Sequence, residues 1–157
     1  FGVAVSEIEL EVLTGRTRVI RSDLLFDAGK SINPAIDLGQ VEGSFLQGLG
    51  LFLSEDIIRD KSGRLITKNA SSYKIPTVHD MPFEFHAELL EDGPASPAVF
   101  SSRGIGEPPL ALAVSAFSAV RQAVASTKQL SSSSSGDEFV VIHSPAVPEM
   151  LMPHLVN

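Results

Sequence analysis

The first part of the chain alternates apolar and polar residues, and the spacing then changes to that of a helix. Over residues 3–12 the alternation has a period of two, which is typical of a strand with one buried face. A turn signal follows at Leu13–Arg16, and residues 17–26 are predicted to form a second strand. The two segments predict a β-hairpin, which ends in a loop over residues 27–34 that contains Gly, Asn and Pro.

A helix is predicted from Pro34, because proline is common at the first helical position. Residues 83–89 alternate like another strand, and a second helical pattern runs from Pro108 to about Ser126. In the first helix, spacings of three and four create two distinct sides. The apolar side carries Leu38, Val41, Phe45, Leu49 and Phe52, and the other side carries Ile36, Gly39, Gln40, Gly43 and Gln47.

The remaining segments are short. Residues 99–107 predict a short strand that runs into a glycine-rich turn. The serine-rich stretch 129–138 predicts a loop or linker, and residues 139–157 predict one strand and one short helix. This mixture predicts an α+β fold, in which a hairpin and other short strands pack with two main helices.

Composition narrows the possible functions. The 157 residues carry a net charge of 12 − 19 = −7, which argues against nucleic acid or an anionic membrane as partner. Because the chain has no cysteine, it cannot itself supply a thiolate metal site, an iron–sulfur ligand or a Cys nucleophile. No histidine pair has metal-ligand spacing, and no uninterrupted run of 18 apolar residues occurs. Since the sequence starts directly in a strand pattern, we expect a segment of a longer protein. We also expect a cytoplasmic location, with which the absence of cysteine is compatible.

Glu107 lies between a glycine and two prolines at the start of the second helical pattern. One interpretation is an ordinary helix N-terminus, where proline loses no useful N–H and an acid meets the positive end of the helix dipole. The other is functional: two stiff prolines and the flanking Gly104 and Gly106 could aim the carboxylate at a ligand as a general base. The pattern alone leaves both interpretations open.

The first predicted helix has four glycines in the twelve residues 39–50. Glycine in a helix interior costs about 1 kcal/mol relative to alanine, so this density needs a reason. Close helix packing, or a helix that ends near Gln47, would explain it. Alternatively, the glycines let the backbone approach a bound cofactor, to which Gln40 and Gln47 offer amide donors and acceptors. The spacing fits neither a Rossmann fingerprint nor a P-loop.

Three stretches together carry a resemblance to a known family. "INPAIDLGQVEGSFLQGLG", "SSYKIP" and "SSRGIGEPPLALAVSAFSAVRQAV" resemble, in this order, the last part of the molybdopterin-binding domain of the xanthine dehydrogenase and aldehyde oxidase family. The resemblance implies that residues 1–128 are the C-terminal portion of a molybdenum cofactor-binding domain. It also implies iron–sulfur clusters and FAD on domains that precede this segment, and a homodimer as the full-length form.

The resemblance also implies roles for particular residues. Members of the family hydroxylate an aldehyde or an N-heteroaromatic, purine-like carbon with oxygen derived from water, and the glutamate that corresponds to Glu107 is the catalytic base. The metal is held by the pterin dithiolene rather than by protein ligands, and Gln40 corresponds to a glutamine that hydrogen-bonds molybdopterin. The expected cofactor-binding set is Gly39, Gln40, Gly43, Arg103, Gly104, Ile105 and Gly106.

The resemblance does not decide between xanthine and aldehyde as substrate, or between NAD and O₂ as electron acceptor. This segment alone is not expected to be active, because the rest of the enzyme chain would supply the other cofactor contacts. The alternative is a non-catalytic fragment or assembly module that retains the fold and binds a partner through an unpaired sheet edge.

Overall fold

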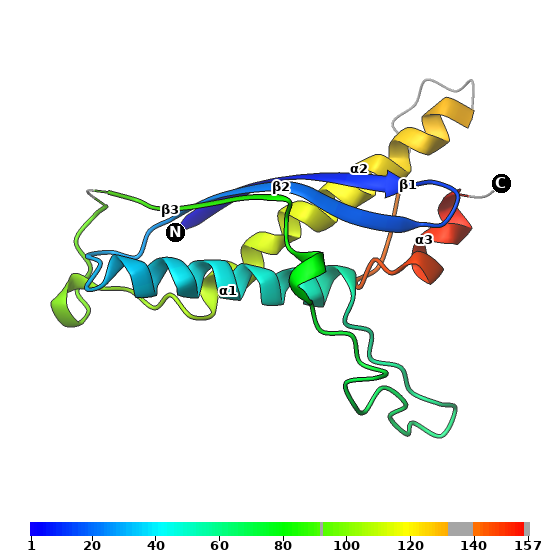
Figure 1. Cartoon of the computed structure of the whole chain (residues 1–157), viewed down its shortest axis with the longest axis horizontal. Helices are drawn as coiled ribbons and strands as arrows, with labels where there is room; N and C mark the ends of the chain where they lie inside the picture. The colour runs from blue at the N-terminus through cyan, green and yellow to red at the C-terminus, as the bar shows by residue number, and fades with distance from the viewer. Residues whose placement is uncertain (92, 132–139, 156–157) are drawn as a thin grey trace.

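The chain folds into a three-stranded sheet with its main helices on one face (Figure 1). The computed structural model describes residues 1–91, 93–131 and 140–155. The sheet order is β1-β2-β3, with β1 and β2 antiparallel and β2 and β3 parallel. The strands are β1 (Gly2–Glu11), β2 (Arg16–Phe26) and β3 (Glu84–Leu89). The predicted hairpin, the third strand and the α+β class are therefore confirmed.

The helices connect and cover these strands. α1 lies between the two parallel strands in the sequence, as the crossover of a βαβ unit does. Asn33 caps α1 by accepting a hydrogen bond from the Ile36 N–H, and Pro34 occupies the first turn. The α-helices are α1 (Pro34–Leu53), α2 (Val114–Ser131) and α3 (Pro148–Leu155), and the 3₁₀ turns are η1 (Val78–Asp80), η2 (Val99–Ser101) and η3 (Pro108–Ala113).

The hydrophobic core lies between the sheet and the helices. Phe45 and Val41 of α1 are fully buried against the inner face of the sheet, and Phe45 packs on Phe85 with ring centroids 5.5 Å apart. A second cluster joins α2 to the C-terminal segment around Val120 and Leu151. Burial of these side chains provides most of the driving force for folding.

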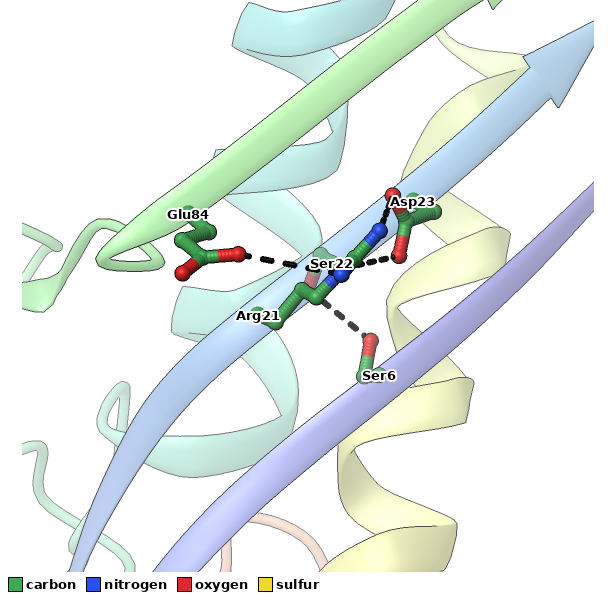
Figure 2. Close-up of polar contacts among 5 residues, drawn as sticks. All are labelled: Ser6, Arg21, Ser22, Asp23 and Glu84. Atoms are coloured by element: carbon green, nitrogen blue, oxygen red, sulfur yellow. Dashed lines mark hydrogen bonds and ion pairs between the residues drawn. The ribbon is translucent and has the colours of Figure 1, made fainter.

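The opposite face of the sheet is open and carries charged side chains near its middle. Figure 2 shows Arg21 of β2 between Asp23 of the same strand and Glu84 of β3. The Arg21 Nε lies 2.6 Å from an Asp23 oxygen, and this hydrogen bond lowers the pKa of the Asp23 carboxyl. On the buried side, the Ser22 hydroxyl pairs with that of Ser6 at 2.9 Å. The sheet therefore has one buried face and one solvent-exposed face.

A long connection follows α1 and projects from the body of the molecule (Figure 1). Tyr73 anchors this connection near the end of α1, because its hydroxyl donates a hydrogen bond to a Glu55 oxygen at 2.5 Å. This hydrogen bond raises the pKa of Tyr73. Thr67 is buried in the same connection and accepts a hydrogen bond from the Ile58 N–H. The connection is thus anchored at a few points and otherwise exposed.

The structure corrects three details of the sequence analysis. Residues 99–107 contain a 3₁₀ turn rather than a strand, and Phe100 and Ser101 have positive φ angles of 52° and 60°, which no extended strand allows. The expected C-terminal strand is absent from residues 140–147, because the backbone there bonds to the end of α1 through Ala146 and Phe52 instead of to the sheet. α2 continues to Ser131, three residues into the predicted linker; residues 132–139 of that linker lie outside the described part.

By length and composition alone, the helical segment 108–128 is long and apolar enough to cross a membrane. In the structure this segment is the turn η3 followed by most of α2, and its positions Ala113, Ala116, Val120 and Val124 are fully buried in the two core clusters. A core helix of a globular domain meets the same criterion.

Candidate functional site

Glu107 lies in the loop that leads into η3, and its carboxylate is exposed. The residue occupies the N-cap position, yet its side chain makes no capping hydrogen bond. Among the described residues, no hydrogen bond or ion pair engages this carboxylate. Its backbone, in contrast, is fixed, because the Glu107 carbonyl accepts hydrogen bonds from the Ser44 hydroxyl at 3.1 Å and the Leu110 N–H at 3.0 Å. The side chain is therefore not used as a helix cap.

The two prolines explain the local geometry. Pro108 and Pro109 have no N–H, so Leu110 supplies the first donor of the segment, and it reaches the carbonyl three residues back. The segment therefore begins as a 3₁₀ turn before it becomes α2. Pro109 is buried, which fixes the turn against the body of the molecule.

The glycines of α1 divide into two groups. A Cβ at Gly48 would collide with the Leu110 carbonyl and lie 2.7 Å from the Ala113 Cβ, so this glycine permits close packing of α1 on η3. A Cβ at Gly39 or Gly43 would meet nothing within 4 Å, and both glycines are exposed. Close helix packing therefore explains Gly48, whereas approach of a cofactor to Gly39 and Gly43 stays a prediction. The helix does not end near Gln47 but continues to Leu53.

The open glycines and the Glu107 loop belong to the same region. Ser44, which binds the Glu107 carbonyl, follows Gly43 directly and lies one turn after Gln40. A Cβ at Gly106 would lie 3.2 Å from the Gln40 side-chain oxygen. Figure 1 shows the chain after β3 passing round the N-terminal end of α1 and then running alongside that helix. The fold therefore brings Gln40, Gly43, Gly106 and Glu107 together from distant parts of the sequence.

The other predicted site residues differ in their surroundings. Gly104 is exposed, and a Cβ there would meet nothing within 4 Å. Ile105 packs its side chain against the core, so it anchors the loop. Arg103 is half-buried, and its guanidinium lies 3.2 Å from an Asp27 oxygen. Direct contact of each of these residues with a cofactor stays a prediction.

Two residues of this region were not identified from the sequence. Ser44 is buried in α1, and only its position beside Gly43 could have drawn attention to it. Asp27 directly follows β2 and is buried to 2% exposure, although a sequence pattern would place an acid there in an exposed loop. Ser44 contacts Glu107 and Asp27 contacts Arg103, and no local pattern contains contacts between positions so far apart in the sequence.

The donor and acceptor groups fit a pterin-type cofactor. The Gln40 amide offers two donors and an acceptor, and no hydrogen bond within the described residues uses them. The open backbone at Gly39, Gly43 and Gly104 allows close approach of a ligand. No group of three or more potential metal-ligating side chains occurs among the described residues.

Comparison with known proteins shows which family the chain belongs to. Residues 1–82 match the family model described as a molybdopterin cofactor-binding domain. The chain belongs to this family. It is 52% identical to the indole-3-acetaldehyde oxidase of Arabidopsis thaliana over 124 residues, which are 79% of this chain and 9% of that protein. It is 44% identical to the xanthine dehydrogenase/oxidase of Mus musculus over 151 residues, which are 96% of this chain and 11% of that protein.

A solved structure shares the fold. The quinoline 2-oxidoreductase of Pseudomonas putida 86 superposes with a TM-score of 0.80 at 30% identity, over 96% of this chain and 18% of that chain. The chain thus spans about a tenth of the length of the Arabidopsis thaliana oxidase and of the Mus musculus dehydrogenase/oxidase. The resemblance to xanthine dehydrogenases and aldehyde oxidases is confirmed, and this chain corresponds to a fragment of such a protein's molybdopterin-binding domain.

Proposed function

We propose that this chain forms one wall of the molybdenum cofactor site in a longer hydroxylase, with Glu107 as its general base. The substrate would be an aldehyde or an N-heteroaromatic, purine-like compound, to whose carbon an oxygen from water is added. The observation that supports this most is the Glu107 carboxylate itself, which is exposed and unengaged while its backbone is fixed to the helix that carries Gln40 and Gly43.

In this proposal, different residues of the chain bind the cofactor and accept the proton. Gln40 binds the pterin through its amide, and the open glycines of α1 and of the loop admit the cofactor to the backbone. When bound, molybdenum-molybdopterin supplies the two-electron oxidation chemistry, which no side chain of this segment offers. Glu107 accepts, at a carboxylate oxygen, the proton that the water-derived nucleophile loses as it attacks the substrate carbon.

The geometry favours Glu107 for this task. A general base must lie about 3 Å from the proton donor in the reactive complex. Because Ser44 binds the Glu107 carbonyl and Pro108 and Pro109 follow it directly, the backbone is fixed here and the side-chain torsions of Glu107 remain to be ordered on binding. Iron–sulfur clusters and FAD, in this proposal, belong to other parts of the longer protein.

The test is Glu107→Gln in the full-length protein that contains this chain. Loss of a general base typically costs about 10²–10⁴-fold in rate, and we expect turnover to fall at least that far while molybdenum and pterin contents stay at the wild-type level. The control is Glu7→Gln, which removes another exposed carboxylate, from the open face of the sheet. Wild-type turnover by the Glu107 variant would remove the assignment.

A second candidate function is a non-catalytic assembly module. It is favoured by the apolar side chains that lie uncovered on the open face of the sheet, among them Val3 and Val5, which are 56% and 67% exposed. β3 also forms an edge of the sheet. Metal analysis of the purified full-length protein separates the candidates: stoichiometric molybdenum supports the hydroxylase, and its absence together with a stable complex with another protein supports the module.

A further inference from the structure

Asp27 is a buried carboxylate that the proposed chemistry does not use. It lies just beyond β2 and is 2% exposed. One of its oxygens accepts a hydrogen bond from the Gly29 N–H at 2.9 Å and lies 3.2 Å from the Arg103 Nε. A charge buried to this extent is tolerated only with a partner, and removal of one partner leaves the other charge uncompensated. Arg103 supplies the cationic side chain beside Asp27, and the N-terminal amine of Phe1 lies 3.9 Å from the other Asp27 oxygen.

Arg103 is held by the chain on several sides. Besides its ion pair with Asp27, its Nη2 donates to the Pro94 carbonyl at 3.1 Å, and its backbone N–H donates to the Ala28 carbonyl at 2.9 Å. The guanidinium also lies 5.9 Å from the centre of the Phe1 ring. These contacts direct Arg103 towards the end of β2, so it is poorly placed to serve as a free cation for a ligand.

The backbone strengthens the same connection. The Lys30 N–H donates to the Ser101 carbonyl at 2.9 Å, and Gly29 forms an isolated bridge with Ser102. Phe100 and Ser101, directly before this bridge, hold positive φ angles that non-glycine residues rarely adopt. Such a conformation persists only where the surrounding contacts impose it. The end of β2 thus imposes the shape of the turn that leads to Glu107.

Only three residues lie between Arg103 and Glu107. Between them Ile105 packs on the core, and at Glu107 the carbonyl is bound by Ser44. We infer that Asp27 and Arg103 are positioning residues, an ion pair that holds the Glu107 loop in its working geometry without touching substrate or cofactor. The inference rests on the proposed function, and it assigns Arg103 a role different from the cofactor contact that the sequence predicts.

The test uses the full-length holoenzyme with Asp27→Asn, Arg103→Met, both together, and Arg103→Lys. Amide hydrogen exchange over residues 99–107, cofactor content and steady-state kinetics are measured for each. The matched control is Arg21→Met, because Arg21 also pairs with carboxylates but on the open face of the sheet. Exchange reports on the loop whether or not the enzyme turns over.

We expect each single variant to exchange at least about tenfold faster over residues 99–107, and the double variant to exchange no faster than the singles. A misplacement of about 1 Å can cost about 10²-fold in rate, so kcat should fall by about 10–100-fold, with KM and cofactor content nearly unchanged. Arg103→Lys, which keeps the charge, should retain most of the wild-type kcat, and Arg21→Met should behave as the wild type.

Three results would overturn the inference. Cofactor loss in Arg103→Met but not in Asp27→Asn would mean that Arg103 contacts the cofactor directly. Unchanged exchange over residues 99–107 would mean that the pair does not hold the loop, and faster exchange across all three strands would mean that it serves the fold in general. Failure of the base assignment is separate, since it would appear as an active Glu107→Gln variant and leave the exchange results intact.

Discussion

The substitution Gly43→Ala tests whether Gly43 is needed for the fold or for approach of the cofactor. A Cβ at this position meets nothing within 4 Å, and the residue lies well inside α1. Replacement by alanine therefore adds helix propensity without a clash, which stabilises the fold by about 1 kcal/mol. For a chain of this size, that gain corresponds to a rise of about 2–4 °C in Tm.

The assay is thermal unfolding of the 157-residue chain without cofactor, followed by circular dichroism. Gly63→Ala is the matched control, because a Cβ there also meets nothing within 4 Å, but its φ of +82° is left-handed. Alanine in that conformation costs about 1–2 kcal/mol, so the two variants should shift Tm in opposite directions. A lower Tm for Gly43→Ala would refute the conclusion that this side of α1 is open.

The functional half of the same prediction is measured in the full-length protein. If the bare backbone at Gly43 admits the cofactor, the added methyl group occupies part of that space, and cofactor content should fall although the fold is more stable. Such an opposition of stability and function is common where a site needs a locally unfavourable residue. A variant that is both more stable and fully loaded would show that Gly43 does not face the cofactor.

The remaining predictions concern the anchors of α1 and of the long connection. Gly48→Ala should destabilise the fold by about 1–3 kcal/mol in denaturant unfolding, because the new methyl group meets the backbone of η3; an unchanged midpoint would contradict the close packing. Ser44→Ala removes the hydrogen bond to the Glu107 carbonyl and should cost about 1 kcal/mol, whereas an effect confined to cofactor content would contradict this role. Tyr73 is the chain's one tyrosine, and its absorbance should titrate above the ordinary tyrosine pKa; Glu55→Gln should reduce this shift, because the hydrogen bond to Glu55 is its largest cause. Since that hydrogen bond favours the protonated phenol, its contribution to stability is full below the ordinary pKa and is lost as pH rises through the raised one.

The local patterns of the sequence predicted the elements well. The period-two alternation of residues 3–12 gave the first strand, and the apolar spacing around Val41 and Phe45 gave α1, because burial of one side imposes these periods on the sequence. The resemblance identified the family, and the structure then brought Gln40 close to Gly106. Contact of these residues with a cofactor was predicted from the resemblance and remains to be measured.

The contacts between distant segments could not be predicted in this way. Asp27 and Arg103 are 76 positions apart (103 − 27), and their pairing depends on how the chain after β3 returns to the end of β2. The same return forces the positive φ angles of Phe100 and Ser101, where the local pattern had predicted a strand. Local propensity is a weak guide where tertiary contacts determine the backbone.

The most direct test of the account is a structure of the full-length protein with its molybdenum cofactor bound. It should show the pterin against the open glycines of α1, within hydrogen-bond reach of Gln40, and the Glu107 carboxylate about 3 Å from the group that gives up its proton. A cofactor bound elsewhere, or a Glu107 side chain locked into contacts with another part of the protein, would contradict the central claim.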